Sequence, residues 1–170
     1  MHIFLQGPSG IGKSTVIHKS IARFSKPPSV GGFITYKIED DGIYICAANQ
    51  ADRRDAVCVA RYDECGAKTA YPEVFNTEGV GFLKNAQNFD LICMDELGYL
   101  ESKAELFMRE VLACLDGGVP IIGVLRDAEI PWHAPVKSHP CVSIIRVSAD
   151  NRDGLPHYLC SMLKQHIRGN

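Results

Sequence analysis

Eight residues near the start of the chain have the types and spacing of a phosphate-binding loop. Residues 7–14 read Gly-Pro-Ser-Gly-Ile-Gly-Lys-Ser, a full match to the pattern G-x-x-x-x-G-K-[ST]. Glycines let such a loop turn tightly and bring backbone N–H groups against phosphate oxygens. The loop would then hold the phosphates of a nucleoside triphosphate (NTP). The residues expected to do so are Gly7, Pro8, Ser9, Gly10, Ile11, Gly12, Lys13, Ser14 and Thr15.

Each polar residue at the end of this loop has an expected role. Lys13 would reach the β- and γ-phosphate oxygens, where it would also assist catalysis, and the Ser14 hydroxyl would ligate Mg²⁺. Thr15 is placed to bond the region of the α-phosphate. The alternative, a chance glycine-rich turn between a strand and a helix, would not explain a lysine and a serine directly after it.

A pair of acidic residues supplies the second part of an NTP site. Asp95 and Glu96 follow the apolar run 91–94, which has the length of a buried strand. Asp95 would hold Mg²⁺ through water, and Glu96 would orient or deprotonate the attacking water. The competing interpretation is a strand end with two solvated acids. Glu101 would either face the site or begin a helix, and the second role is ordinary compensation of a helix dipole.

Three more candidates follow predicted strands. Arg126 comes just after the apolar run 121–125, and Asn151 and Arg152 come shortly after another run. The carboxyl ends of strands in open α/β sheets line the ligand crevice. Arg126 would there stabilise charge on the γ-phosphate, and Asn151 and Arg152 would contact the base or ribose. Their alternatives are an ordinary surface arginine and a helix start capped by Asp153.

Apolar spacing predicts the elements that must position these residues. Strands alternate with helices, which predicts a mainly parallel sheet covered by helices, because parallel strands need crossover connections. The fold class is therefore α/β in three layers, with an early β-hairpin around the turn 39–42. The loop around Gly66 has no predicted structure, and 128–140 is expected to be a loop with at most one helical turn. Strands are expected at 2–6, 32–38, 43–47, 57–60, 91–94, 119–125 and 142–147, and helices at 13–24, 73–87, 104–115 and 155–167.

Composition limits the class of protein. A chain of 170 residues with 46% hydrophobic residues predicts one domain, 1–170. The net charge of −2 gives no basic field for nucleic acid. No apolar run is long enough to span a membrane and no signal peptide is recognised, so we expect no membrane partner and a cytoplasmic location. The seven cysteines lack metal-binding spacing, so neither zinc nor a disulfide is expected.

At this point the chain resembles a known family, the cancer-related or thermophile-type nucleoside-triphosphatases. The resemblance rests on residues 7–15, on Gly-Gly-Phe-Ile-Thr at 31–35, on Met-Asp-Glu-Leu-Gly-Tyr-Leu-Glu at 94–101 and on Asn-Arg-Asp at 151–153. It implies a RecA-like P-loop core in which the strand before Asp95 is set apart from the P-loop strand. It also implies slow, Mg²⁺-dependent hydrolysis of several NTPs to the diphosphate (NDP) and phosphate, and the same site residues.

The chain departs from the family pattern at three positions. An acid usually follows the Gly-Phe-x-Thr segment and an arginine lies in the next turn, where this chain has Tyr36 and Ile43. A hydroxyl residue usually stands where this chain has Val124. These departures indicate a changed substrate range or rate rather than a loss of NTP binding.

Two alternatives to hydrolysis remain open from the sequence. A P-loop kinase would pass the phosphoryl group to a small metabolite by the same positioning and electrostatics, with Arg53, Arg54 and Arg61 as lid residues. These arginines also read as an ordinary solvated face. A nucleotide-dependent switch would hydrolyse slowly and order a segment for a protein partner.

Overall fold

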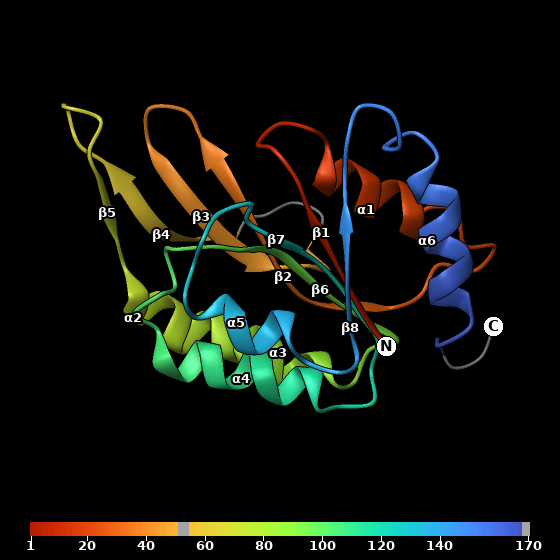
Figure 1. Ribbon diagram of the computed structural model, residues 1–170. Helices are drawn as coiled ribbons and strands as arrows, with labels where there is room; N and C mark the ends of the chain where they lie inside the picture. The colour runs from red at the N-terminus through yellow and green to blue at the C-terminus, as the bar shows by residue number, and fades with distance from the viewer. Residues whose placement is uncertain (51–54, 168–170) are drawn as a thin grey trace.

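The residues that the structure describes form one eight-stranded sheet with helices packed on it. Figure 1 shows the computed structural model, which describes residues 1–50 and 55–167. Arg53 and Arg54, considered above as lid residues, lie outside the described residues. The strands lie in the order β5-β4-β3-β2-β6-β7-β1-β8. They are β1 (His2–Gln6), β2 (Val30–Ile38), β3 (Gly42–Ala47), β4 (Val57–Tyr62), β5 (Lys68–Ala70), β6 (Leu91–Leu97), β7 (Ile121–Leu125) and β8 (Val142–Arg146).

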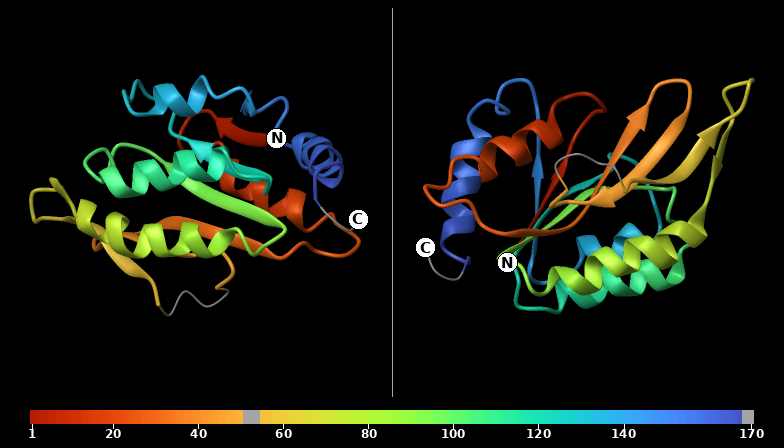
Figure 2. Two further views of the ribbon diagram at one scale, coloured as in Figure 1. Left: turned by 90° about the horizontal axis from the view of Figure 1, so that it is seen from below. Right: turned by 180° about the vertical axis from the view of Figure 1, so that it is seen from behind.

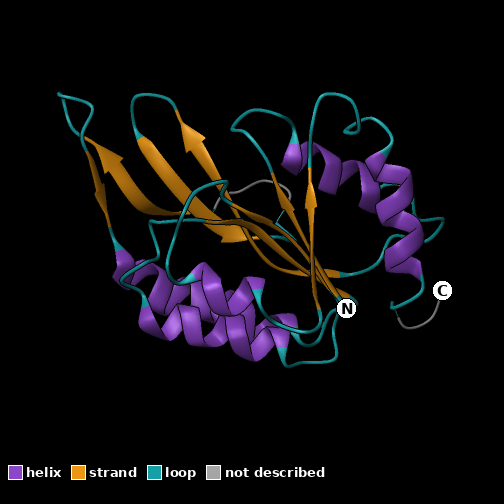
Figure 3. Ribbon diagram, viewed as in Figure 1, coloured by secondary structure: helices purple, strands orange, loops and turns teal. Residues whose placement is uncertain are grey.

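Helices cover both faces of this sheet and make three layers, as expected from the sequence (Figure 3). Helices α1 and α6 lie on one face and the remaining helices on the other, as the two views of Figure 2 show. Two buried apolar clusters fill the spaces between sheet and helices, one under each layer. The helical segments are α1 (Lys13–Ile21), α2 (Pro72–Val74), the π-helix η1 (Phe75–Gly79), α3 (Val80–Ala86), α4 (Glu105–Leu115), α5 (His133–Lys137) and α6 (Leu155–Lys164).

The sheet has a parallel half and an antiparallel extension, and strand β2 belongs to both. Strands β2, β6, β7, β1 and β8 are parallel, so their carboxyl ends lie along one edge. Strand β2 also pairs antiparallel with β3, and β4 and β5 continue that extension. Strand β7 separates the P-loop strand β1 from β6. This is the separation that the resemblance implied.

Local predictions were mostly correct, with boundaries that differ by a few residues. The predicted helix 73–87 is helical from Pro72 to Ala86 and includes the π-helical turn η1. The segment 128–140 contains the short helix α5. The strand β5 was not predicted, because its three residues follow a turn at Gly66 and carry no apolar alternation. None of the helices in residues 1–50 and 55–167 has the length and apolar composition that spanning a bilayer requires.

Close contact between β2 and β6 requires a glycine at position 32. Gly32 has a φ of 91°, and a Cβ atom there would lie 2.1 Å from the carbonyl oxygen of Cys93 in β6. An L-residue side chain is therefore both strained in its backbone and in collision with main-chain atoms. Since Gly32 lies only three residues before Thr35 in β2, this contact also helps to set the position of Thr35 beside β6.

We expect Gly32→Ala to lower the free energy of unfolding by at least about 3 kcal/mol, because the strands must separate to admit the methyl group. Gly81→Ala is the matched control, since a Cβ atom at this position in α3 meets nothing within 4 Å. That change should stabilise the chain by up to about 1 kcal/mol. Urea unfolding of both variants gives the comparison. Equal stabilities of Gly32→Ala and the parent chain would contradict the close contact.

Candidate functional site

The turn from β1 into α1 has the backbone shape of a phosphate-binding loop. Gly10 and Gly12 have φ angles of 76° and 104°, which residues with a Cβ atom rarely adopt. Gly12 stands at the N-cap of α1, and the helix begins at Lys13. The first backbone N–H groups of a helix have no partner within it and lie at the positive end of its dipole. The sequence therefore places both required features, glycine conformations and a helix start, at the predicted loop.

Lys13 is folded back onto this loop. Its side-chain Nζ donates hydrogen bonds to the carbonyl oxygens of Gly7 and Pro8, at 2.8 Å and 2.9 Å. The residue is only 8% exposed. The ammonium group therefore lies inside the curve of the loop, where the phosphates of a bound nucleotide would compete with the two carbonyl groups for it.

Asp95 lies next to Ser14, although their positions are far apart in the sequence. Asp95 is 5% exposed and forms a side-chain hydrogen bond with Ser14. Burial raises the pKa of Asp95 above its usual value, and the bond with Ser14 partly opposes that effect. A cavity of about 310 Å³ adjoins the pair and is also lined by Thr15 and His18. The fold thus brings together the two residues for which the sequence predicts a role in holding Mg²⁺, and that role stays a prediction.

These oxygen groups suit a magnesium ion. Mg²⁺ prefers oxygen ligands, and it is usually held by one or two protein groups together with phosphate oxygens and water. A hydroxyl and a carboxylate side by side at the phosphate-binding loop match that donor set. A cation there would also favour the charged form of Asp95, which burial alone disfavours.

Glu96 and Arg126 form the other side of the site. The Nη1 atom of Arg126 lies 3.3 Å from Oε1 of Glu96, and the two side chains are 44% and 30% exposed. Both line a cavity of about 190 Å³ between the P-loop and the end of β7, called the P-loop cavity below. Its lining residues are Gly7, Pro8, Ser9, Lys13, Glu96, Arg126 and Asp127.

The hydroxyl of Thr35 holds the peptide that joins the two acids. Its Oγ1 donates to the carbonyl oxygen of Asp95 at 3.2 Å and accepts the N–H of Glu96 at 3.1 Å. The register between β6 and β7 shifts between Met94 and Leu97, so the acidic pair lies at an irregularity of the sheet. Sequence reasoning noted Thr35 only as part of a family motif. The available signal was a hydroxyl residue inside the predicted strand 32–38.

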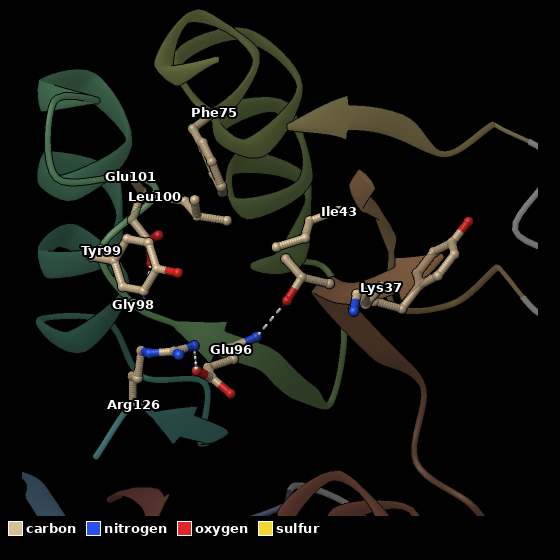
Figure 4. Close-up of a pocket in the computed structure, with 11 residues that line it drawn as sticks. Lys37, Ile43, Phe75, Glu96, Gly98, Tyr99, Leu100, Glu101 and Arg126 are labelled. Carbon is tan, nitrogen blue, oxygen red and sulfur yellow. Dashed lines mark hydrogen bonds and ion pairs between the residues drawn. The ribbon is translucent and has the colours of Figure 1, made fainter. Parts of the chain in front are cut away.

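A second cavity lies on the far side of Glu96 and Arg126 and is shown in Figure 4. This distal cavity has a volume of about 180 Å³ and reaches from the site toward the β2–β3 hairpin. Tyr36 and Ile43, the two departures from the family pattern, both line it, whereas Val124 is fully buried in β7. The lining residues are Thr35, Tyr36, Lys37, Ile43, Phe75, Glu96, Gly98, Tyr99, Leu100, Glu101 and Arg126.

Glu101 lines the distal cavity beside Glu96 and Arg126 and does not begin a helix. It lies before α4 rather than in it, is 2% exposed, and accepts the backbone N–H of Gly98 through Oε1. Burial is the main cause that raises its pKa from 4.5 to about 7, and the bond from Gly98 partly opposes the shift. The expected helix-dipole role is therefore wrong, because Glu101 instead closes the turn after β6.

The other residues considered from the sequence, Asn151 and Arg152 for the base or ribose and Arg61 for a lid, do not line the P-loop cavity. Asn151 shapes the loop after β8, since its Oδ1 accepts the N–H of Ser148 and its Nδ2 donates to the carbonyl of Arg146, both at 2.9 Å. Arg152 is exposed in the same loop. This loop adjoins the P-loop (Figure 1), although neither residue lines the P-loop cavity. Arg61 lies on β4 and pairs with Asp41 at 3.4 Å.

Comparisons with known proteins agree with this geometry. The profile of a family described as NTPase matches residues 2–160. The nucleoside-triphosphatase THEP1 of Methanosarcina barkeri is 29% identical, with 97% of this chain and 98% of that protein covered. The mouse cancer-related nucleoside-triphosphatase homolog is 26% identical, with 91% and 92% covered.

Solved structures show the same fold. The crystal structure of THEP1 from the hyperthermophile Aquifex aeolicus superposes with a TM-score of 0.80 at 20% identity, over 96% of this chain and 99% of that one. The solution structure of a human cancer-related nucleoside triphosphatase gives 0.75 at 21% identity, over 96% and 97%.

The raised pKa of Glu101 predicts a pH-dependent stability. The folded chain binds this proton more tightly than the unfolded chain does, so stability falls as the pH rises from about 4.5 to about 7. Relative to the parent, Glu101→Gln should therefore gain up to about 3 kcal/mol in unfolding free energy between pH 5 and pH 8. Denaturant unfolding at both pH values measures this difference. Glu105→Gln, at an exposed position, should show no such gain, and a parallel response of both variants would refute the assignment.

Proposed function

The chain belongs to the NTPase family, and on that premise we propose that it hydrolyses nucleoside 5′-triphosphates to NDP and inorganic phosphate. The observation that carries the proposal is that Glu96 and Lys13 line the same cavity at the phosphate-binding loop. A carboxylate within reach of the γ-phosphate position is what activation of water requires. Curated relatives along the full length of the chain are named nucleoside-triphosphatases, which supports the same reaction.

Each residue of the site has a part in the proposed reaction. The N–H groups of residues 7–14 and the ammonium of Lys13 bind the β- and γ-phosphates. Glu96 accepts a proton from the attacking water as its oxygen bonds to the γ-phosphorus. The bond from that phosphorus to the β–γ bridging oxygen breaks, and NDP leaves with that oxygen. Arg126 stabilises the charge that spreads over the γ-phosphoryl oxygens.

Ser14 and Asp95 are the residues that would hold Mg²⁺ at this site. The ion supplies charge neutralisation of the phosphate oxygens when bound. Because Asp95 is buried, its carboxylate would be held in its charged form by the ion and by Lys13 rather than by solvent.

The base side of the site has few specific contacts to offer. Asn151 and Arg152 are the candidates for the base or ribose, and Asn151 uses both its amide groups to shape its own loop. A base held by one exposed arginine would be tolerated broadly, so we propose slow hydrolysis of several NTPs. The cytoplasmic location and the lack of a nucleic-acid or membrane partner stay predictions from the sequence.

Phosphate release from each of ATP, GTP, CTP and UTP with Mg²⁺ tests the function directly. We expect release from several of them, with Lys13→Ala as the blank, because that change removes the ammonium from the phosphate-binding loop. Lys84→Ala is the matched control, since Lys84 is an exposed lysine on α3 that lines neither the P-loop cavity nor the cavity beside Ser14 and Asp95. No release by the parent chain above the blank, with NTP binding intact, would instead favour a kinase or a switch.

Substitutions at Glu96 and Thr35 test whether Glu96 acts on the attacking water and whether the Thr35 hydroxyl positions it. Glu96→Gln should lower kcat by about 10²- to 10⁴-fold and leave NTP affinity within about twofold, because it removes a proton acceptor and keeps the shape. Thr35→Val should lower kcat by about tenfold through a misplaced Glu96, whereas Thr35→Ser keeps the hydroxyl and should retain most activity. Steady-state kinetics and a nucleotide-binding titration separate the two effects. Equal kcat values for the Val and Ser variants would rule out positioning by the hydroxyl.

A further inference from the structure

Two cavities share one wall, and that wall is the pair Glu96 and Arg126. Both residues line the P-loop cavity and both line the distal cavity. In Figure 4 the dashed line between them marks their 3.3 Å contact at the edge of the distal cavity. Since neither side chain is tightly buried, a change of side-chain rotamer can open the wall. An ion that moves from the γ-phosphate position in the direction away from the nucleotide therefore enters the distal cavity.

Cationic side chains border the distal cavity and are held there by aromatic rings. Lys37 lines it, with Nζ 5.2 Å from the centre of the Tyr62 ring. Lys68 does not line the cavity but contacts Tyr99, which does: its Nζ donates to the hydroxyl of Tyr99 at 2.7 Å and lies 5.1 Å from that ring. The guanidinium of Arg126 lies 4.8 Å from the Tyr99 ring on the site side. Three cations thus lie along one path out of the site.

The carboxyl groups of the same cavity oppose these cations only weakly. Glu96 is paired with Arg126. Glu101 is buried and accepts the N–H of Gly98, and its pKa of about 7 leaves it partly neutral near neutral pH. Because Glu96 and Arg126 offset each other, the excess of positive charge along the path comes from Lys37 and Lys68, and this excess favours an anion.

The size of the distal cavity limits the occupant. A volume of about 180 Å³ corresponds to roughly six waters at about 30 Å³ each. A tetrahedral oxyanion with part of its hydration fits this space.

We propose that the distal cavity is a binding site for the inorganic phosphate released by hydrolysis, through which this product leaves while NDP still occupies the P-loop. The inference rests on the proposed function, because hydrolysis produces the anion at the shared wall. Arg126 passes the ion from the γ-position to Lys37 and Lys68. No bond is made or broken in this step, and the ion moves along a row of positive charges toward solvent.

Equilibrium binding of inorganic phosphate to the protein saturated with ADP and Mg²⁺ tests the proposal without turnover. Titration calorimetry on the full chain is the measurement. The double variant Lys37→Gln/Lys68→Gln should bind phosphate about fivefold more weakly, because it loses two partly exposed charges, and should bind ADP as before. Lys84→Gln, an exposed lysine on α3, removes one charge of the same sign away from the cavity and should change neither affinity.

The charge-keeping variant Lys37→Arg/Lys68→Arg distinguishes charge from shape, and it should retain phosphate affinity within about twofold. Unchanged phosphate affinity in the Gln double variant would overturn the proposal, because the ion would then bind at the γ-position alone. Absence of saturable phosphate binding by the ADP-loaded parent chain would overturn it as well. Failure of the proposed function shows itself separately, as absence of phosphate release from NTPs by the same preparation.

Discussion

The two hydrogen bonds of the Thr35 hydroxyl fix the peptide between Asp95 and Glu96, and the geometry of the site follows from them. Asp95 and Glu96 are neighbours on β6, but their side chains contact different residues. Asp95 lies with Ser14 under the P-loop helix, and Glu96 lies with Arg126 at the wall between two cavities. A displacement of this one peptide would move both carboxylates at once. The site therefore depends on a contact between strands as much as on the P-loop itself.

Strand β2 transmits that dependence to the rest of the fold. It is parallel to β6 on one side and antiparallel to β3 on the other, so it joins the nucleotide-binding half of the sheet to the antiparallel extension. Gly32 lets β2 approach β6 closely, and Thr35 then reaches the acidic pair from the same strand. The extension in turn carries Lys37 and Lys68, which border the distal cavity. Strand β2 thus contains the glycine that allows close packing on β6, the threonine that contacts the acidic pair and a lysine that lines the distal cavity.

Much of this structure could be predicted from the sequence, because the strongest patterns act locally. The glycines of the loop 7–14 determine its backbone conformation, and the apolar run before Asp95 determines a buried strand. Both features can be recognised without knowledge of the rest of the fold. The contacts of Thr35 and of Lys68 could not be predicted, since they join residues about 30 to 60 positions apart through sheet register and side-chain reach. Glu101 was misjudged for a related reason. An acid before a helix suggests the dipole, but burial and the N–H of Gly98 decide its state.

The position of Lys13 has a thermodynamic consequence for ligand binding. Its ammonium already makes two hydrogen bonds to the loop that a phosphate would otherwise complete. Binding therefore exchanges carbonyl partners for phosphate oxygens instead of creating new hydrogen bonds from solvated groups. The enthalpy gained at Lys13 on binding is therefore the difference between its hydrogen bonds to phosphate and its hydrogen bonds to the two carbonyl groups. Because Lys13 is already ordered before the ligand binds, little conformational entropy is lost at this residue on binding. Affinity at such a loop is then set mainly by the charge of the ligand, which makes it sensitive to ionic strength.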